Sequence, residues 1–221
     1  YNLNNRDKEK PEGEMNICVT MFGDGASNQG QVWESANMAK LWHLPQIFVI
    51  ENNQYGMGTS TERSSSSTQY YMMGKHHIPG IQADGNNVFA VREAVRRCRE
   101  LCATGKGPIF LELKTYRYHG HSMSDPGITY RTRDEIQNVR QTRDSVNYIG
   151  HILVNNGIMD EKGWKDFQTE IKKEVKGWVN DCLKEPFPDD SALMTDVYYG
   201  KDPDFIRNTE YINSKSSKPL L

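Results

Sequence analysis

The sequence predicts an α/β fold in which a parallel sheet is flanked by helices, with a helical extension at the C-terminus. Apolar runs of strand length alternate with helical patterns, the runs at 15–23, 46–51, 81–83 and 108–116 and the patterns at 29–43 and 87–102. Strands that alternate with helices over short turns form right-handed crossovers, which make the strands parallel and place helices on both faces of the sheet.

The individual segments support this assignment in order. Met15–Gly23 and Gln46–Glu51 are apolar and bounded by turn residues, which predicts two strands buried on both faces. The helical pattern between them is stopped by Pro45. The Gly- and Ser-rich segment 55–69 predicts a long mobile loop. In the second helix the apolar residues share one face: Val88, Val91, Ala94, Val95, Cys98, Leu101 and Cys102.

Beyond Tyr116 the pattern changes to a loop rich in His, Ser and Arg and then to helices at about 134–156 and 160–183. The second of these has an apolar stripe that predicts a core contact, made of Trp164, Phe167, Ile171, Val175 and Trp178. We expect a single domain with a site-bearing part at 1–133 and a helical region with its tail at 134–221.

Composition limits the classes of partner. The 27 Lys and Arg residues are matched by 29 Asp and Glu residues, for a net charge of −2, which argues against binding to nucleic acid or to an anionic membrane. No apolar run approaches the ~20 residues of a membrane span. The four cysteines form no CxxC motif, which favours a reducing compartment, with Cys98 and Cys102 packed in or near the core. The chain starts at Tyr1 without a methionine, so we expect a fragment whose targeting segment lies upstream.

Two strand ends hold the candidate site. Asp24 lies between Gly23 and Gly25 at the end of the first strand, and Asn53 ends the next strand. Neighbouring parallel strands run ~4.8 Å apart, so both side chains can reach one small volume at the carboxyl edge of the sheet. Their oxygens suit Mg²⁺, and the glycines let a diphosphate approach the backbone. On these residues alone, a tight strand-to-helix turn that needs glycine remains the alternative.

The pattern GDG followed by ENN resembles the diphosphate-binding signature of thiamine-diphosphate enzymes. The longer stretches GDGASNQGQVWESANMAKLW, IENNQYGMGTS and TYRYHGHSMSDPG resemble the alpha-subunit family of the pyruvate dehydrogenase decarboxylase component. The resemblance runs from about Met15 to the C-terminus. It implies a thiamine-diphosphate-binding fold with Mg²⁺ held by Asp24, Asn53 and the backbone carbonyl of Tyr55.

The same resemblance implies roles for further residues. Gly25 and Ala26 would give backbone contacts to the diphosphate, and Arg117 would pair with one of its oxygens. His121 would be the acid–base residue beside the thiazolium ring. Without the resemblance, the ordinary interpretation of Arg117 is a solvated strand-end charge, and that of His121 an exposed loop histidine.

The activity implied by the resemblance is oxidative decarboxylation of pyruvate, with transfer of the two-carbon unit to a lipoyl group. Its cofactors are thiamine diphosphate and Mg²⁺. The implied partners are a beta subunit in an assembly of two alpha and two beta chains, a dihydrolipoyl acetyltransferase core, and a regulatory kinase and phosphatase in the mitochondrial matrix. Alternatives are a branched-chain 2-oxoacid or acetoin dehydrogenase alpha subunit, or a non-catalytic interaction subunit.

Three hydroxyl residues match the family's phosphorylation positions. Ser122 directly follows His121 and resembles the site at which a dedicated kinase inactivates the family, and Ser60 matches a second site. Thr129 stands at a third, where the family usually has Ser. The aromatic tail DVYYGKDPDF would help to cover an interface between chains.

Overall fold

The computed structural model describes residues 15–195. The strands are β1 (Cys18–Gly23), β2 (Gln46–Asn52), β3 (Tyr55–Gly56), β4 (Thr59–Ser60), β5 (Gly80–Asp84) and β6 (Ile109–Lys114). The helices are α1 (Asp24–Ser27), α2 (Gly30–Leu41), α3 (Thr61–Ser64), α4 (Val88–Ala103), α5 (Arg133–Arg143), α6 (Ser145–Asn155) and α7 (Glu161–Cys182), with 3-10 turns η1 (Tyr70–Met72) and η2 (Asp190–Met194). All four main strands and both main helices of the predicted α/β pattern are present, which confirms the fold class.

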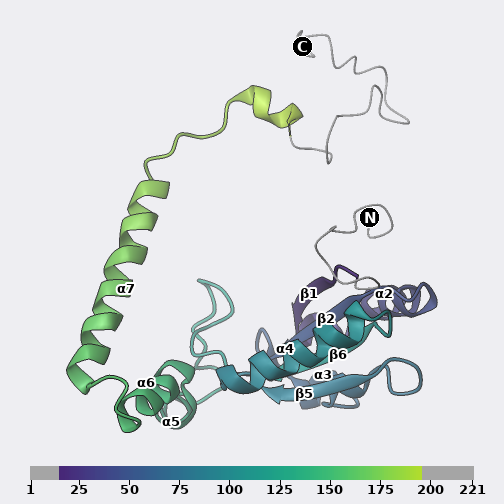
Figure 1. Cartoon of the computed structure of the whole chain (residues 1–221), viewed down its shortest axis with the longest axis horizontal. Helices are drawn as coiled ribbons and strands as arrows, with labels where there is room; N and C mark the ends of the chain where they lie inside the picture. The colour runs from purple at the N-terminus through teal and green to yellow at the C-terminus, as the bar shows by residue number, and fades with distance from the viewer. Residues whose placement is uncertain (1–14, 196–221) are drawn as a thin grey trace. The chain divides into compact units, whose positions relative to one another are not determined.

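The main sheet has the order β1-β2-β6-β5, and every pair in it is parallel (Figure 1). Strand β2 lies between β1 and β6, with Gly23 opposite Glu51 and Asn52 opposite Lys114. The carboxyl ends of β1, β2 and β6 therefore meet at one edge of the sheet, where the predicted site residues follow them.

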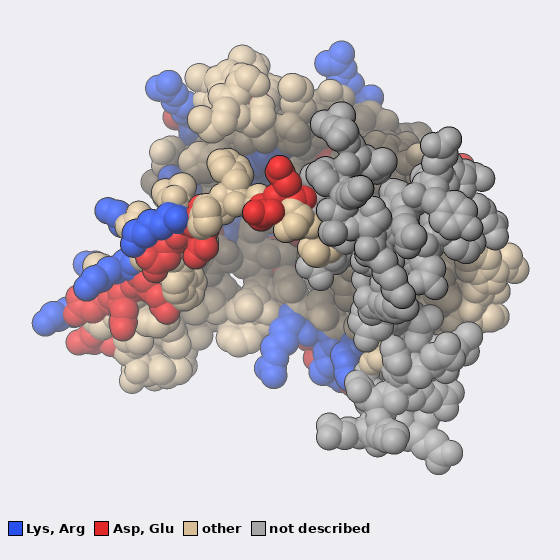
Figure 2. All heavy atoms as spheres, turned by 90° about the horizontal axis from the view of Figure 1, so that it is seen from above, with Lys and Arg blue, Asp and Glu red and all other residues tan. Residues whose placement is uncertain are grey.

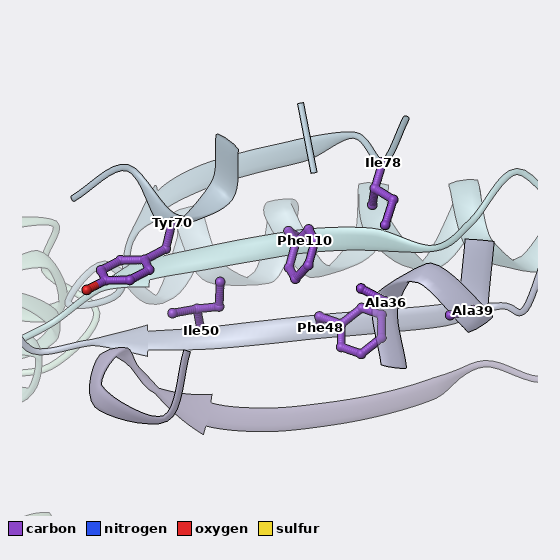
Figure 3. Close-up of a cluster of buried hydrophobic side chains, with 7 residues drawn as sticks. All are labelled: Ala36, Ala39, Phe48, Ile50, Tyr70, Ile78 and Phe110. Carbon is purple, nitrogen blue, oxygen red and sulfur yellow. The ribbon is translucent and has the colours of Figure 1, made fainter. Parts of the chain in front are cut away.

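A hydrophobic cluster fills each face of the sheet. One joins the central strands to α2 and to the segment around η1, and Figure 3 shows its buried members: Ala36, Ala39, Phe48, Ile50, Tyr70, Ile78 and Phe110. The other joins the same strands to α4: Ile47, Val49, Ala94, Cys98, Cys102, Ile109 and Leu111. Successive residues of β2 and β6 thus alternate between two buried faces, which is why these strands are apolar throughout.

Strand β1 differs from its prediction as a buried strand. It begins at Cys18 rather than Met15, and Val19 and Met21 are 46% and 67% exposed. The reason is its position at the edge of the sheet, where β2 is its one partner among the described strands. An apolar run gives the same sequence pattern at an edge as in the middle of a sheet.

The segment 55–69 was predicted as a long mobile loop, and this was wrong for its first half. Strands β3 and β4 form an antiparallel hairpin with Tyr55 opposite Ser60, and α3 follows directly. The turn depends on left-handed backbone at Met57, with φ of 56°, and Gln54 before the hairpin has φ of 72°. Non-glycine residues seldom adopt this conformation, so these two residue types carry no turn signal.

Helix α4 has one buried and one charged face. Asn87 caps its first turn by accepting from the backbone N–H groups of Phe89 and Ala90. On the buried face, burial raises the pKa of the Cys98 thiol to about 12 and that of Cys102 to about 11, so both are protonated packing residues, as predicted. The described cysteines are all free thiols.

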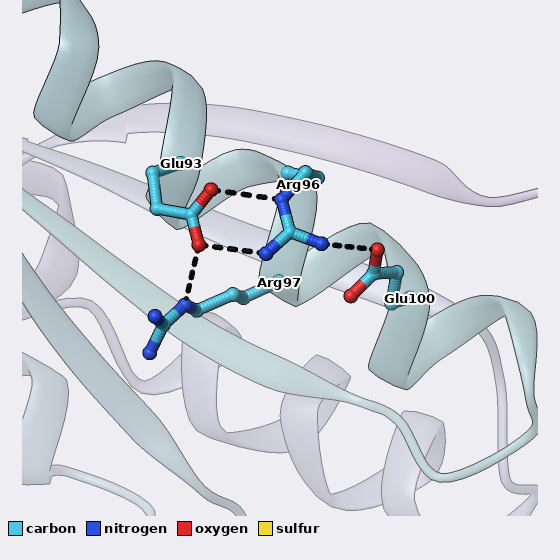
Figure 4. A network of polar contacts seen from close by, with 4 residues as sticks. All are labelled: Glu93, Arg96, Arg97 and Glu100. Carbon is cyan, nitrogen blue, oxygen red and sulfur yellow. Dashed lines mark hydrogen bonds and ion pairs between the residues drawn. The ribbon is translucent and has the colours of Figure 1, made fainter.

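On the exposed face of α4, Glu93 accepts from Arg96 at 2.7 Å and from Arg97 at 2.8 Å, and Arg96 also pairs with Glu100 (Figure 4). Bonds from Arg96 and Arg97 lower the pKa of Glu93 to about 2. Such exposed pairs add little to stability. Acidic and basic side chains are likewise interspersed on the face drawn in Figure 2.

The contacts divide the chain into two compact units, one ending at Asp160 and one beginning at Glu161. Helices α5 and α6 belong to the first unit, and a division after residue 133 stays a prediction. Helix α7 of the second unit has no buried residue, and Phe167 and Trp178 are 45% and 59% exposed. Within the described residues of this unit, the predicted stripe therefore makes no core contact. No described helix is long and apolar enough to span a bilayer. The predicted interface tail at 196–205 lies outside the described residues.

Candidate magnesium and diphosphate site

Asp24 begins α1 directly after β1 and is 2% exposed. Its Oδ1 accepts from the backbone N–H of Asn53 at 3.3 Å, which joins the ends of β1 and β2. Burial raises the pKa of the Asp24 carboxyl, and backbone hydrogen bonds and the nearby charge of Arg117 partly oppose this. A cation placed beside this buried carboxylate would favour its ionised form.

Asn53 and Tyr55 are held by a tight turn at the end of β2. The side-chain oxygen of Asn53 accepts from the backbone N–H of Tyr55 at 3.2 Å, and that of Asn52 accepts from Gln54 N–H at 2.9 Å. These consecutive Asx turns reverse the chain into β3. The structure thus joins Asn53 to Asp24 by a hydrogen bond and places Tyr55 in the same turn. That these three residues hold a metal stays a prediction.

Two glycines permit a close backbone approach next to this turn. A Cβ atom on Gly25 would lie 3.0 Å from Cα of Gly56, and one on Gly56 would lie 3.1 Å from Cα of Gly25. Both contacts are tighter than nine in ten real Cβ contacts, so a side chain at either position would displace α1 from β3 by a few tenths of an ångström. Gly25 and Ala26 are exposed in α1, where backbone groups remain accessible to a ligand.

Arg117 follows β6 and reaches the same turn. Its Nη1 donates to the carbonyl of Tyr55 at 3.4 Å, and its Nη2 donates to the carbonyl of Met57 at 2.6 Å and to the hydroxyl of Tyr130 at 2.8 Å. Its Nε is buried and has no hydrogen-bond partner. Arg117 is therefore a half-buried cation next to Asp24 rather than a solvated strand-end charge.

His121 is exposed, and it is connected to the site through its backbone. Its N–H donates to Oδ2 of Asp125 at 2.7 Å, and Asp125 also accepts from Gly127 N–H at 2.8 Å and from the hydroxyl of Tyr130 at 2.7 Å. Because Tyr130 also accepts from Arg117, one network links the His121 loop to the metal-site turn. Sequence reasoning missed Asp125 and Tyr130, and no periodic pattern could have found them.

Arg131 is a third residue that sequence reasoning missed. It is 4% exposed and donates to the carbonyls of Arg117 and His119, the latter at 3.1 Å. Its guanidinium lies 5.6 Å from the ring centroid of Tyr55 and 5.1 Å from that of Tyr130. The buried Arg131 guanidinium thus holds the backbone at Arg117 and at His119, just before His121.

The predicted modification positions lie in different surroundings. Ser122 is exposed, and its hydroxyl lies 3.0 Å from that of Ser124. Thr129 is also exposed in the same loop, whereas Ser60 is half-buried at the end of β4.

The donor set suits the predicted metal. A carboxylate, a side-chain amide oxygen and a backbone carbonyl are hard oxygen ligands, which is the chemistry Mg²⁺ prefers, with remaining positions left to water and phosphate. The described residues include no group of three or more His, Cys, Asp or Glu side chains that could hold a metal. Asp24, Asn53 and the Tyr55 carbonyl thus fit a hard cation whose other ligands are water and a diphosphate.

The sequence profile of the family described as "Dehydrogenase E1 component" matches residues 8–190. The chain belongs to the dehydrogenase E1 component family.

Membership of this family implies use of thiamine diphosphate. Among its relatives, the chain is 47% identical to the mitochondrial pyruvate dehydrogenase E1 component subunit alpha type II of Ascaris suum, over 96% of this chain and 56% of that protein. It is 45% identical to the somatic form of the mitochondrial pyruvate dehydrogenase E1 component subunit alpha of Homo sapiens, over 94% of this chain and 53% of that protein. The chain thus spans about half the length of the curated relatives it matches.

We expect the order of the His121 loop of this E1 chain to be lost in acid. Hydrogen bonds from His121 N–H, Tyr130 and Gly127 N–H lower the pKa of Asp125 to about 2. A lowered folded-state pKa stabilises the loop above the ordinary value of 3.8, and this stabilisation is lost as the pH falls toward about 2. Hydrogen exchange of peptides covering 117–131, corrected for intrinsic rates, is the measurement.

The matched variant for this test is Asp125→Asn, which has no carboxylate to titrate. The wild-type loop should lose protection between pH 4 and about 2, while the variant is less protected already at pH 6 and changes little. Equal, pH-independent protection in both proteins would contradict the assignment.

Proposed function

We propose that this chain is part of the alpha subunit of a mitochondrial pyruvate dehydrogenase, acting in oxidative decarboxylation of pyruvate and reductive acetylation of lipoyl groups. One observation supports this most. The buried Asp24 carboxylate meets the Asn53 turn at the carboxyl edge of a parallel sheet, in a chain 45–49% identical to curated pyruvate dehydrogenase alpha subunits.

The proposed cofactors are thiamine diphosphate and Mg²⁺. Asp24, Asn53 and the Tyr55 carbonyl would hold the metal, and the backbone at Gly25 and Ala26 would contact the diphosphate. When bound, thiamine diphosphate supplies the electron sink that lets a 2-oxoacid lose CO₂. Arg117 would bind a diphosphate oxygen through a guanidinium that already lies half-buried beside the turn.

His121 is the proposed acid–base residue. An imidazole has two ring nitrogens, one of which can accept a proton and later return it to a reacting group. The bond from its backbone N–H to Asp125 fixes the loop position from which the ring must reach the reacting carbon.

The proposed partners are a beta subunit, in an assembly of two alpha and two beta chains, and the dihydrolipoyl acetyltransferase core. A regulatory kinase and phosphatase would act on Ser122, Ser60 and Thr129. The relatives named above are mitochondrial, and we propose the mitochondrial matrix for this chain.

The test uses the full-length alpha subunit co-purified with its beta subunit. Binding of thiamine diphosphate is measured by calorimetry with and without Mg²⁺, and CO₂ release is measured from pyruvate and from 2-oxoisovalerate. We expect Mg²⁺-dependent binding and at least about tenfold preference for pyruvate, a difference of about 1.4 kcal/mol. Preference for the branched substrate would reject the assignment of pyruvate, and absence of Mg²⁺-dependent binding would reject the enzyme itself.

A further inference from the structure

Glu112 is a buried acid that the proposed reaction does not use. It lies in β6, directly opposite Ile50 of β2 and Gln82 of β5, and it is 0% exposed. Because side chains alternate along a strand, it lies on the same face of the sheet as Phe110, which belongs to the cluster drawn in Figure 3. A fully buried acid in the centre of an apolar sheet needs hydrogen-bond partners.

Both oxygens of Glu112 accept hydrogen bonds from N–H groups. Oε1 accepts from Nδ2 of Asn52 at 2.7 Å, and Oε2 accepts from the backbone N–H of Tyr71 at 3.0 Å. A carboxylate offers an acceptor at each of these two positions, whereas a carboxamide has an oxygen at one of them and an NH₂ group, a donor, at the other.

The bond to Glu112 fixes the direction of the Asn52 side chain. With its Nδ2 donating to Glu112, its Oδ1 points to Gln54 and accepts from that residue's N–H at 2.9 Å. Gln54 is thereby held with left-handed backbone, φ 72°, and its carbonyl accepts from Thr61 N–H at 3.1 Å. Asn53 is the residue between Asn52 and Gln54 in this turn.

This turn is the one that carries the candidate metal ligands. Asn53 donates its N–H to Asp24, and its side-chain oxygen accepts from Tyr55 N–H. A rotation of the Asn52–Gln54 turn would therefore move two candidate ligands, Asn53 and the Tyr55 carbonyl. Glu112 also lies close enough to Asp24 for its charge to raise the pKa of that carboxyl.

We propose that Glu112 is a positioning residue for the candidate magnesium site, acting through Asn52 to hold the turn that presents Asn53 and the Tyr55 carbonyl. This inference rests on the proposed function, because the turn matters only if it binds a metal and diphosphate. Partners that orient metal ligands typically contribute about ten- to hundredfold to metal affinity.

The geometry offers an exchange test. In Glu112→Gln, one of the two donors, Asn52 or Tyr71, loses its acceptor. When Asn52→Asp is combined with Glu112→Gln, the introduced amide can donate to the introduced carboxylate and still accept from Tyr71 N–H. The introduced carboxylate in turn still accepts from Gln54 N–H. The exchanged pair therefore keeps all these groups bonded with the same net charge.

The experiment measures Mg²⁺ affinity at fixed thiamine diphosphate, by calorimetry on the full-length alpha subunit assembled with its beta subunit. Glu112→Gln should bind Mg²⁺ at least about tenfold more weakly, and the double variant should return to within about threefold of wild type. Glu100→Gln, which neutralises an exposed acid on helix α4, should change nothing. Hydrogen exchange at Gln54 without cofactor should be faster in the single variant and restored in the double variant.

The outcomes are distinguishable. If wild type binds Mg²⁺ and a folded Glu112→Gln protein binds it with the same affinity, the positioning role alone is overturned. Absence of Mg²⁺-dependent binding in wild type would overturn the proposed function and this role with it. If the single variant does not fold, the double variant decides: wild-type affinity supports the role, and a folded protein with about tenfold weaker affinity overturns it.

Discussion

Replacing Asp24 with asparagine is expected to abolish Mg²⁺-dependent binding of thiamine diphosphate and, in the metal-free protein, to raise the thermal unfolding temperature. The loss of binding follows because Asp24 is the only charged ligand in the proposed donor set. Attraction between unit charges at partly buried sites is worth several kcal/mol, so a loss of at least about a hundredfold in affinity is expected. Asn53→Ala should weaken binding less, because it removes a neutral oxygen.

The gain in stability follows from burial. Asp24 is 2% exposed and its pKa is raised, chiefly by burial, so the folded state disfavours the ionised form. Above the ordinary value of 3.8 the wild-type protein therefore loses stability as the pH rises, until Asp24 is ionised in the folded state as well. Asparagine keeps an oxygen for Asn53 N–H without this cost. A gain of about 1 kcal/mol at neutral pH corresponds to about 2–4 °C.

Calorimetric unfolding of the metal-free assembly from pH 3 to pH 8 is the measurement. The difference between Asp24→Asn and wild type should be present at pH 7 and vanish below about pH 3.8, where the residue is neutral in both folded and unfolded protein. Saturating Mg²⁺ and cofactor should reverse the order, because they stabilise only wild type. A variant that is less stable than wild type at pH 7 without metal would show that Asp24 has a structural role instead.

A sequence pattern encodes where strands end more fully than it encodes where each strand lies in the sheet. The ends of β1 and β2 were predictable because Gly23-Asp24-Gly25 and Asn52-Asn53 interrupt apolar runs, and parallel pairing then brings them together. The exposure of Val19 and Met21 was not predictable, because an apolar run does not specify which strand lies at the edge of the sheet. Strand β1 is an edge strand of the main sheet (Figure 1).

The network around the His121 loop could not be predicted for a different reason. Arg131 donates to the carbonyls of Arg117 and His119, and Asp125 accepts two backbone N–H groups. Every residue type carries the same backbone C=O group, and all but proline the same N–H group, so hydrogen bonds to these groups cannot be inferred from residue types or spacing. The fold could therefore be inferred from local patterns, whereas the connection between this loop and Asp24 needed the three-dimensional structure.

That connection makes Ser122 the position where added charge should have the largest regulatory effect. Ser122 is exposed and therefore accessible, and its backbone carbonyl accepts from Asp125 N–H at 3.1 Å. Asp125 in turn accepts from His121 N–H and from Tyr130, which accepts from Arg117. A phosphate at Ser122 adds about −1.5 to −2 charges beside the Asp125 carboxylate and competes for Arg117.

We therefore expect Ser122→Glu in the assembled enzyme to lower turnover at least about tenfold, equivalent to about 1.4 kcal/mol, and to increase protease cleavage between Tyr116 and Arg133. Ser122→Gln introduces a side chain of nearly the same size as that of Ser122→Glu but without the charge, so it should keep most activity and an intact loop. Ser122→Ala should turn over but resist the proposed kinase. Equal losses in the Glu and Gln variants would assign the effect to bulk. Full activity and an ordered loop in Ser122→Glu would show that a negative charge here does not release the Asp125 network. The loop would then have to be regulated, if at all, through Ser60 or Thr129, neither of whose hydroxyls is tied to Asp125 in the described hydrogen bonds.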